Sequence, residues 1–160
     1  MDDLEIRPAR PEDCEAVAAM VLRLAALFGV KSGTTGEALR HEAFGPRPTI
    51  GILVATAGDT LAGYLVHQDT FSTWRGANGL FVVDLFVEPE RRRDGIGLKL
   101  LQAAARAGAA QGARFLRLDL DESNEGARRF YRRLGFRELA HDRFFVLDEP
   151  GVLKLAAEGG

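Results

Sequence analysis

The most constraining feature of the sequence is a nearly continuous apolar run at positions 79–87, Gly-Leu-Phe-Val-Val-Asp-Leu-Phe-Val. β-Branched and aromatic residues dominate this run, which is typical of a strand that is buried on both faces. Such a strand needs a packed layer on each side of its sheet. Asp84 is the only charged residue in the run. A carboxylate in this position requires either a hydrogen-bonding partner or a chemical role.

Strand and helix patterns alternate along the rest of the chain. Apolar residues recur at helical spacing between Pro11 and Gly29, and two alternating runs flank the turn sequence at 57–60. We predict strands at 4–7, 50–56, 61–68, 79–87 and 115–120, and a strand or hairpin at 136–147. We predict helices at 11–28, 35–44, 95–111 and 124–134, and a short helix from Pro150. This order indicates an α/β or α+β domain around one mixed sheet.

Composition narrows the possible functions. The chain has 160 residues, a formal net charge of −2 and a single cysteine, Cys14. The length fits one domain, and the charge balance argues against a general nucleic-acid-binding protein. A lone cysteine forms no intrachain disulfide, and no Cys/His pair has zinc-finger spacing, so no metal is expected. The acidic start at positions 1–4 and the absence of a long apolar run argue against export and membrane insertion, which leaves the cytoplasm as the expected location.

A glycine-containing turn follows the apolar run, Arg-Arg-Asp-Gly-Ile-Gly at 92–97, and opens a long helix. The first turn of a helix has unpaired N–H groups and the positive end of the helix dipole, and glycine lets a phosphate approach closely. A Walker loop and a dinucleotide-binding loop are both excluded, because Leu98 and Leu100 stand where those loops need other residues. The turn therefore predicts a pyrophosphate site. The alternative is a solvated arginine run before a helix that begins with glycine.

A second motif, Asn-x-x-Ala-x-x-Phe-Tyr-x-x-Leu-Gly-Phe, occupies 124–136. Together with Arg-x-x-Gly-x-Gly at 92–97, it resembles the two signature motifs of the GNAT superfamily of acetyl-CoA-dependent N-acetyltransferases. The resemblance covers about 80–136, and a looser likeness to the spermidine/spermine N-acetyltransferase branch extends over nearly the whole chain. It implies a single domain over 1–160, with a central mixed, largely antiparallel, twisted sheet flanked by helices.

The resemblance also implies roles for individual residues. One strand would lie along the pantetheine arm of acetyl-CoA and offer it backbone groups: Leu85, Phe86 and Val87. The glycine turn would hold the pyrophosphate: Arg92, Arg93, Asp94, Gly95, Ile96, Gly97 and Leu98. Asn124 matches a residue that contacts the cofactor near its sulfur, and Tyr131 matches the tyrosine that protonates the departing thiolate. The acetyl group would pass directly to an amine, and relatives in this branch are commonly homodimers.

Other interpretations of these residues stay open. Tyr131 follows Phe130 on an amphipathic helix, where a packed aromatic side chain is the ordinary expectation. Asp84 is either hydrogen-bonded at a strand bend or a general base that deprotonates the incoming ammonium through water. Cys14 and the three histidines are expected to be structural or exposed: His41, His67 and His141. An arginine cluster is expected to be a solvated helix face, with contact to the cofactor 3′-phosphate as the alternative: Arg128, Arg129, Arg132 and Arg133.

The resemblance is incomplete where it concerns the acceptor. Polyamine-acetylating relatives have acidic residues late in the first helix, where this chain has Arg23, Leu27 and Phe28, and a glutamate where it has Val83. These differences predict a less cationic acceptor than a polyamine, and Arg23 is expected to repel one. The predicted acceptor site comprises Trp74, Asp84, Leu27 and Phe28, with Asp69 as a further candidate and a loop at 71–78 as its roof. Trp74 would contact the amine by a cation–π interaction.

Three functions follow from these observations. The leading hypothesis is an N-acetyltransferase for a primary amine of a small molecule: an amino acid, a thialysine-like compound, a monoamine or a diamine. The second is a protein N-terminal or lysine acetyltransferase, which would need an open groove for a peptide. The third is a non-catalytic acyl-CoA-binding module, which the presence of Tyr131 disfavours.

Overall fold

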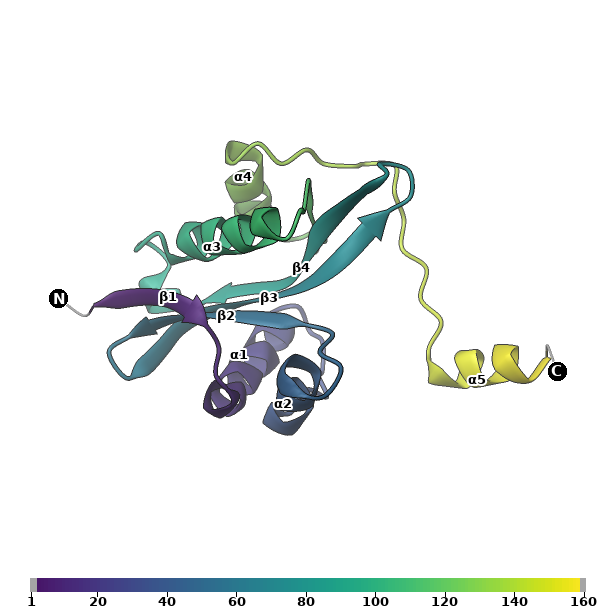
Figure 1. The fold of residues 1–160 in the computed structure, drawn as a ribbon, viewed down its shortest axis with the longest axis horizontal. Helices are drawn as coiled ribbons and strands as arrows, with labels where there is room; N and C mark the ends of the chain where they lie inside the picture. Colours follow the sequence, from purple (N-terminus) through teal and green to yellow (C-terminus); the bar gives the residue numbers. More distant parts are fainter. Residues whose placement is uncertain (1–2, 159–160) are drawn as a thin grey trace. The chain divides into compact units, whose positions relative to one another are not determined.

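A five-stranded mixed sheet forms the centre of the N-terminal part of the chain in a computed structural model, which describes residues 3–158 (Figure 1). The strands lie in sequence order: β1 (Leu4–Pro8), β2 (Gly51–Ala57), β3 (Thr60–Ser72), β4 (Ala77–Val87) and β5 (Leu116–Leu118). The first four pair in antiparallel fashion, and β5 is parallel to β4. The expected mixed, largely antiparallel sheet is therefore confirmed.

Helices cover both faces of this sheet (Figure 1). A short 3-10 turn, Pro11–Asp13, leads into α1 (Cys14–Leu27), and α1 lies on one face together with α2 (Gly36–Phe44). Thr35 caps α2, because its hydroxyl accepts a hydrogen bond from the Ala38 N–H at 3.1 Å. On the other face, α3 (Ile96–Ala110) connects β4 to β5 and provides the crossover that a parallel pair requires.

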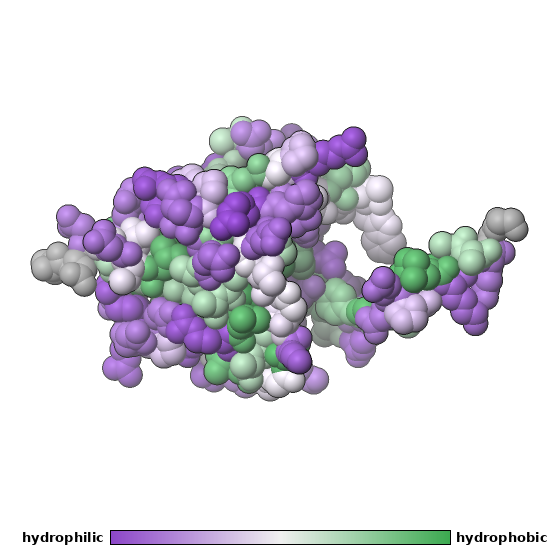
Figure 2. Space-filling model, turned by 90° about the horizontal axis from the view of Figure 1, so that it is seen from below, coloured by the Kyte–Doolittle hydropathy of each residue, from purple (hydrophilic) through white to green (hydrophobic). Residues whose placement is uncertain are grey.

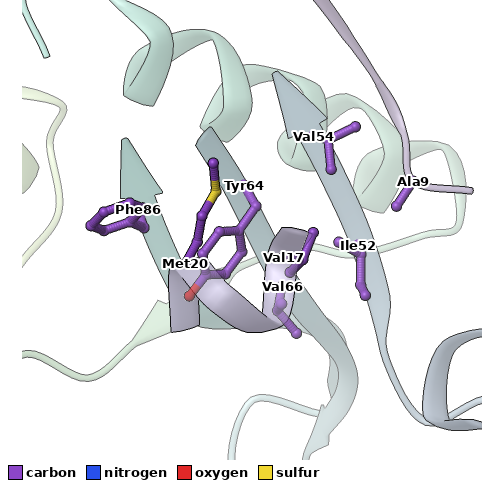
Figure 3. Close-up of a cluster of buried hydrophobic side chains, with 8 residues drawn as sticks. All are labelled: Ala9, Val17, Met20, Ile52, Val54, Tyr64, Val66 and Phe86. Carbon is purple, nitrogen blue, oxygen red and sulfur yellow. The ribbon is translucent and has the colours of Figure 1, made fainter. Parts of the chain in front are cut away.

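The main hydrophobic core lies between the sheet and α1 (Figure 3). Its buried members come from the segment after β1, from α1 and from the three central strands: Ala9, Val17, Met20, Ile52, Val54, Tyr64, Val66 and Phe86. On the opposite face, α3 buries Ile96, Leu100, Leu101 and Ala104. Burying a large aliphatic side chain contributes about 1.5–3 kcal/mol, so these two layers hold the sheet rigidly.

The hairpin of β3 and β4 is longer than the sequence patterns predicted. The two strands pair as far as Ser72 and Ala77, so only 73–76 form the turn. Asp69 and Phe71 therefore lie in β3, and half of the loop expected at 71–78 is paired strand. The expectation that β4 is buried on both faces was also wrong for its second half, where Val83 is 39% exposed.

Contacts within the chain form two compact units that divide between Asp121 and Glu122. The second unit contains α4 (Glu125–Arg133) and α5 (Glu149–Glu158). Met1, Asp2, Gly159 and Gly160, the ends of the domain expected over 1–160, lie outside the described residues. No helix among the described residues is long and apolar enough to cross a membrane.

The strand or hairpin expected at 136–147 is not found. This segment has no strand in the part of the chain that the structure describes, and α4 and α5 contain no buried residue. Four consecutive apolar side chains are exposed in it: Phe144, Phe145, Val146 and Leu147. Figure 2 shows that hydrophobic residues reach the surface among hydrophilic ones on one face of the molecule. The sequence predicted a strand or hairpin in this segment, but a strand forms only where a neighbouring strand pairs with its backbone. None of the described residues provides that neighbour.

Candidate active site

The two halves of β4 differ at a β-bulge. Val66 pairs with Asp84 and the next residue of β3, His67, pairs with Val82, so Val83 is an extra residue on β4. The pairing of β4 with β5 also ends here, at Val82 and Leu118. From Val83 to Val87, β4 is paired to β3 on one side only, and the described residues place no strand along its other edge.

The open edge presents backbone groups in a regular alternation. Glu88, the residue after β4, donates its N–H to the Ala62 carbonyl of β3 at 2.9 Å. Successive residues of a strand direct their backbone groups to opposite sides, so those of Leu85 and Val87 point away from β3. The Val87 carbonyl accepts a hydrogen bond from Arg92 Nε at 3.3 Å, which agrees with this direction. The edge can therefore bind an extended ligand that contains amides, as another strand would.

Asp84 lies beside the bulge, half-buried, on the face that α1 and α2 cover. The hydroxyl of Tyr64 donates a hydrogen bond to Asp84 Oδ2 at 3.5 Å. Burial raises the pKa of Asp84, and the hydrogen bond from Tyr64 lowers it in part. The structure thus provides the hydrogen-bonded strand bend that was one of the two interpretations, and it leaves the carboxylate partly accessible for the other.

The glycine turn opens α3 without a side-chain cap. Gly95 occupies the N-cap position with φ +71°, in the left-handed region that favours glycine, and within the described residues no N-cap side chain bonds to the first turn. Arg91 and Asp94 form an ion pair at 2.6 Å across the turn. Uncapped N–H groups at the positive end of a 15-residue helix can bind an anion.

The structure limits what several of the expected cofactor residues can contribute. Phe86 is 4% exposed and Ile96 is fully buried, so their side chains belong to the core and only their backbone remains for a ligand. The Asp94 carboxylate is bound to Arg91. Arg92 and Arg93 are exposed, and Gly97 and Leu98 are half-buried in the first turn of α3.

In the second unit, α4 holds the two residues of the other motif. Asn124 is its N-cap, with Oδ1 accepting from the Ala127 N–H at 3.1 Å. Tyr131 is half-buried, and its ring makes edge-to-face contacts with Phe130 and Phe136, with centroids 5.2 and 5.3 Å apart. Burial raises the pKa of Tyr131 to about 12. Its phenol therefore stays protonated at neutral pH and can donate a proton.

The arginine cluster of α4 is partly neutralised. Arg128 forms ion pairs with Glu125 and Glu138, and Arg132 pairs with Glu138 at 2.5 Å. Arg129 and Arg133 are exposed. Arg129, Arg132 and Arg133 are thus on an exposed, charged helix face, whereas the Arg128 side chain is only 21% exposed.

The candidates for the acceptor site are dispersed in the first unit. Trp74 is 99% exposed in the hairpin turn and makes almost no contact with the rest of the chain. Asp69 is exposed on β3, Leu27 is the exposed last residue of α1, and Phe28 is half-buried beside it. Among the described residues, no hydrogen bond, ion pair or ring contact joins any of these four to Asp84, whose side-chain partner is Tyr64.

Arg23 is not the isolated charge that the sequence suggested. Its guanidinium forms two hydrogen bonds with Glu88, at 2.5 and 3.1 Å, and lies 5.8 Å from the centroid of the Phe86 ring. Glu88 neutralises most of the repulsion that an unpaired arginine would exert on a cationic acceptor. The expectation that Arg23 repels a polyamine is therefore wrong, because Arg23 is paired. Leu27, Phe28 and Val83 still supply no carboxylate.

The remaining candidates have structural surroundings. Cys14 is fully buried in α1, and burial raises the pKa of its thiol. His67 is half-buried, burial lowers its pKa, and its Nδ1 has no hydrogen-bond partner among the described residues. His41 and His141 are exposed.

Sequence analysis did not single out Tyr64, Glu88 or the bulge at Val83. The sequence offered little indication of a functional role for Tyr64, because a tyrosine in a strand is usually an ordinary core residue. Its contact with Asp84 depends on strand register, which the sequence alone does not give.

Comparison with known proteins identifies the family. The sequence model described as the acetyltransferase (GNAT) family matches residues 19–136. The chain belongs to this family. The resemblance inferred from the two motifs is thereby confirmed, and so is an acetyl-transferring enzyme. The family uses acetyl-CoA as its co-substrate.

Relatives and solved structures agree with this assignment. A thialysine N-epsilon-acetyltransferase from Sus scrofa is 32% identical over 149 residues, which cover 87% of each chain. An integron cassette protein from V. cholerae has a TM-score of 0.79 at 20% identity and covers 96% of this chain and 97% of its own. An aminoglycoside acetyltransferase from an uncultured soil sample, in complex with sisomicin, has a TM-score of 0.73 at 20% identity, covering 91% and 97%. These two structures support the fold alone.

Proposed function

We propose that the protein transfers the acetyl group of acetyl-CoA to a primary amine of a small molecule. The observation that carries this proposal is the open edge of β4 from Val83 to Val87, which a short 3-10 helix, Pro89–Arg91, and the glycine turn connect to the uncapped N-terminus of α3. The relative from Sus scrofa, named for thialysine acetylation and matched over 87% of each chain, supports a small amine as acceptor.

The residues present fit acetyl-CoA. The first-turn N–H groups of α3 at Ile96, Gly97 and Leu98 would bind the pyrophosphate, with Arg92 and Arg93 adding positive charge. The backbone of Leu85 and Val87 would pair with the amides of the pantetheine arm. When bound, acetyl-CoA supplies an acetyl group activated as a thioester.

The chain itself would supply proton transfer and charge stabilisation. Asp84 would accept, through water, the proton that the acceptor ammonium must lose before it can attack. The backbone N–H at the open edge would donate to the acetyl carbonyl oxygen, whose negative charge increases during the transfer. Tyr131, protonated at neutral pH, would give its proton to the departing sulfur. Two protons leave the acceptor nitrogen. One passes through Asp84 to water, and the second, lost as the amide forms, replaces the proton that Tyr131 gives to sulfur. The products are the amide, the CoA thiol and one proton in water, and no covalent acyl-enzyme is needed.

We further propose that the two units act as one catalytic domain. The match to the family runs from 19 to 136 and therefore spans the division at Asp121. A homodimer in the cytoplasm is part of the same proposal, and light scattering of the purified protein would measure the oligomeric state.

The acceptor is proposed to have one positive charge near the reacting amine, as a thialysine-like amino acid or a monoamine has. Each further ammonium of a polyamine must lose water on entering a site, and only a waiting carboxylate offsets that cost. Leu27, Phe28 and Val83 provide none, and Glu88 is already paired with Arg23.

The test is a panel of amines assayed for acetyl-CoA-dependent release of CoA, at low and high salt. We expect a specificity constant about 100-fold higher for a thialysine-like amino acid or a monoamine than for spermine. Tyr131→Phe serves as the control for background hydrolysis. Preference for spermine by tenfold or more would overturn the acceptor assignment and point to other carboxylates, such as Asp119, Asp121 or Glu122. A peptide turned over faster than every small amine would indicate a protein acetyltransferase.

A further inference from the structure

Tyr64 has a hydroxyl group where packing alone requires none. Its side chain is fully buried in β3, in the core between the sheet and α1 (Figure 3). Phenylalanine would fill the same space. The only side-chain hydrogen bond of Tyr64 within residues 3–158 runs to Asp84 Oδ2, at 3.5 Å. A buried hydroxyl needs a partner, so the pairing with Asp84 explains why a tyrosine is stable here.

The strand register fixes this pairing. Tyr64 lies opposite Phe86 and Val66 lies opposite Asp84, so Tyr64 and Asp84 are diagonal neighbours on one face of the sheet. The Tyr64 ring packs against the Phe86 ring, with centroids 6.2 Å apart, and Arg23 covers Phe86 from α1. The Phe86 ring thus packs between Tyr64 and Arg23, and the carboxylate that the Tyr64 hydroxyl contacts lies beside the bulge at Val83.

The direction of the hydrogen bond is fixed by charge. Burial and the negative charge of Asp84 both raise the pKa of Tyr64, so its hydroxyl stays protonated and acts as the donor. Burial raises the pKa of Asp84, and the hydrogen bond from Tyr64 opposes that rise. The charged or titratable groups on the neighbouring elements include Arg23 and Glu88, which pair with each other, and Glu15 of α1, which pairs with Arg40 of α2. The neighbouring strands add His67 and Asp69 of β3 and Arg117 of β5, which lies opposite Phe81.

We propose that Tyr64 is a positioning residue for Asp84: it keeps the carboxylate ionised and fixes Oδ2, so that Oδ1 is left to take the proton of the acceptor amine. The inference rests on the proposed function, in which Asp84 acts as the base. It adds a buried residue of β3 to that site and assigns the lower pH limit of the reaction to the Tyr64–Asp84 pair. Acceptor deprotonation at low pH would then depend on both residues, although only Asp84 meets the acceptor's proton.

Tyr64→Phe removes only the hydroxyl and is the variant to test. The Asp84 carboxyl is followed by ¹³C NMR during a pH titration of the resting protein, without acetyl-CoA or amine. Loss of a hydrogen bond to the ionised form should raise the titration midpoint by about one pH unit. In the pH profile of kcat/KM, the decline at low pH, which we call the acid limb, should shift to higher pH by the same amount. Within the acid limb, kcat/KM of Tyr64→Phe would be about tenfold lower than that of the wild type, and at higher pH the two would differ little.

The chain offers a matched control, because it contains only two tyrosines. Tyr131→Phe makes the same substitution in α4 and should lower kcat while the Asp84 midpoint and the acid limb stay in place. Asp84→Asn assigns the NMR signal and should remove the limb. Incorporation of 3-fluorotyrosine into Tyr131→Phe labels Tyr64 alone. The more acidic fluorophenol is a stronger donor and should lower the Asp84 midpoint. This measurement tests the Tyr64–Asp84 pairing even if Tyr64→Phe fails to fold.

The outcomes separate this proposal from the proposed function. A midpoint and an acid limb that rise together in Tyr64→Phe support it. An unchanged midpoint overturns it, and so does a midpoint that rises while the limb stays, because Tyr64 would then hold Asp84 without affecting the reaction. If the wild-type protein acetylates no amine, the proposed function fails. The midpoints of the resting protein then still decide whether Tyr64 keeps Asp84 ionised.

Discussion

The two halves of β4 have similar composition but different surroundings. From Leu80 to Val82 the strand is paired on both sides, to β3 and β5, and Leu80 and Val82 are 2% and 3% exposed. From Val83 to Val87 it keeps β3 and loses β5. Apolar side chains hold both halves in the sheet, so the difference lies in the backbone. A strand becomes a binding edge where its neighbour ends, and the adjoining helix N-terminus adds an anion site to that edge.

The largest effect is expected from a charge placed in the first turn of α3, the helix that follows the open half. Gly97→Asp puts a carboxylate into the first turn of α3, where it would fill the phosphate space and repel the pyrophosphate. We expect the thermal stabilisation by acetyl-CoA to disappear while the fold is retained. Gly97→Asn, equal in size but neutral, is the control and should weaken binding less. Unchanged acetyl-CoA affinity of Gly97→Asp in calorimetry would show that the N-terminus of α3 does not bind the cofactor.

The next effect concerns the proton donor assigned to the second unit. Tyr131→Phe should lower kcat by roughly 10²- to 10⁴-fold, because the hydroxyl acts only in the transition state. Acetyl-CoA affinity and the circular dichroism spectrum should stay close to those of the wild type. Turnover within a factor of two of the wild type would reduce Tyr131 to a packing residue.

A matched pair of leucines tests the comparison within β4 itself. Leu80→Ala, in the half paired on both sides, should lower the free energy of unfolding by about 2–5 kcal/mol and leave acetyl-CoA affinity unchanged in the folded protein. Leu85→Ala, at a half-buried position on the open half, should cost about half as much and weaken acetyl-CoA binding. Urea unfolding and calorimetry measure the two quantities. Equal losses of stability from both variants would show that the two halves of β4 contribute equally to the free energy of unfolding.

The smallest effect is expected at the ion pair beside the open half. The Arg23 side chain is 55% exposed, so Arg23→Gln should change the free energy of unfolding by less than about 1 kcal/mol. The variant frees the Glu88 carboxylate, and the specificity constant for spermine should therefore rise relative to that for a monoamine. A loss of several kcal/mol in urea unfolding, or a lower relative constant for spermine, would contradict this account of Arg23.

Local sequence patterns located most of the elements correctly. The helix expected at 95–111 is α3 at Ile96–Ala110, and the strand expected at 79–87 is β4 at Ala77–Val87. Hydrophobic periodicity and glycine stops are local signals, and they suffice for elements that pack onto one core. The strand expected at 136–147 failed because pairing is not a local property. The length of the β3–β4 hairpin was missed for the same reason.

By itself, the sequence determined the family motifs, the glycine turn at 92–97 and the position of a single carboxylate in a buried strand. The tertiary structure decided which groups surround that carboxylate. Tyr64 and Asp84 are 20 residues apart, and Arg23 and Glu88 are 65 apart. Contacts over such distances depend on strand register and on the bulge at Val83, and a shift of one residue would send each side chain to the opposite face. The sequence gives the chemistry of each side chain directly, whereas strand register is fixed only when the whole sheet packs against its helices.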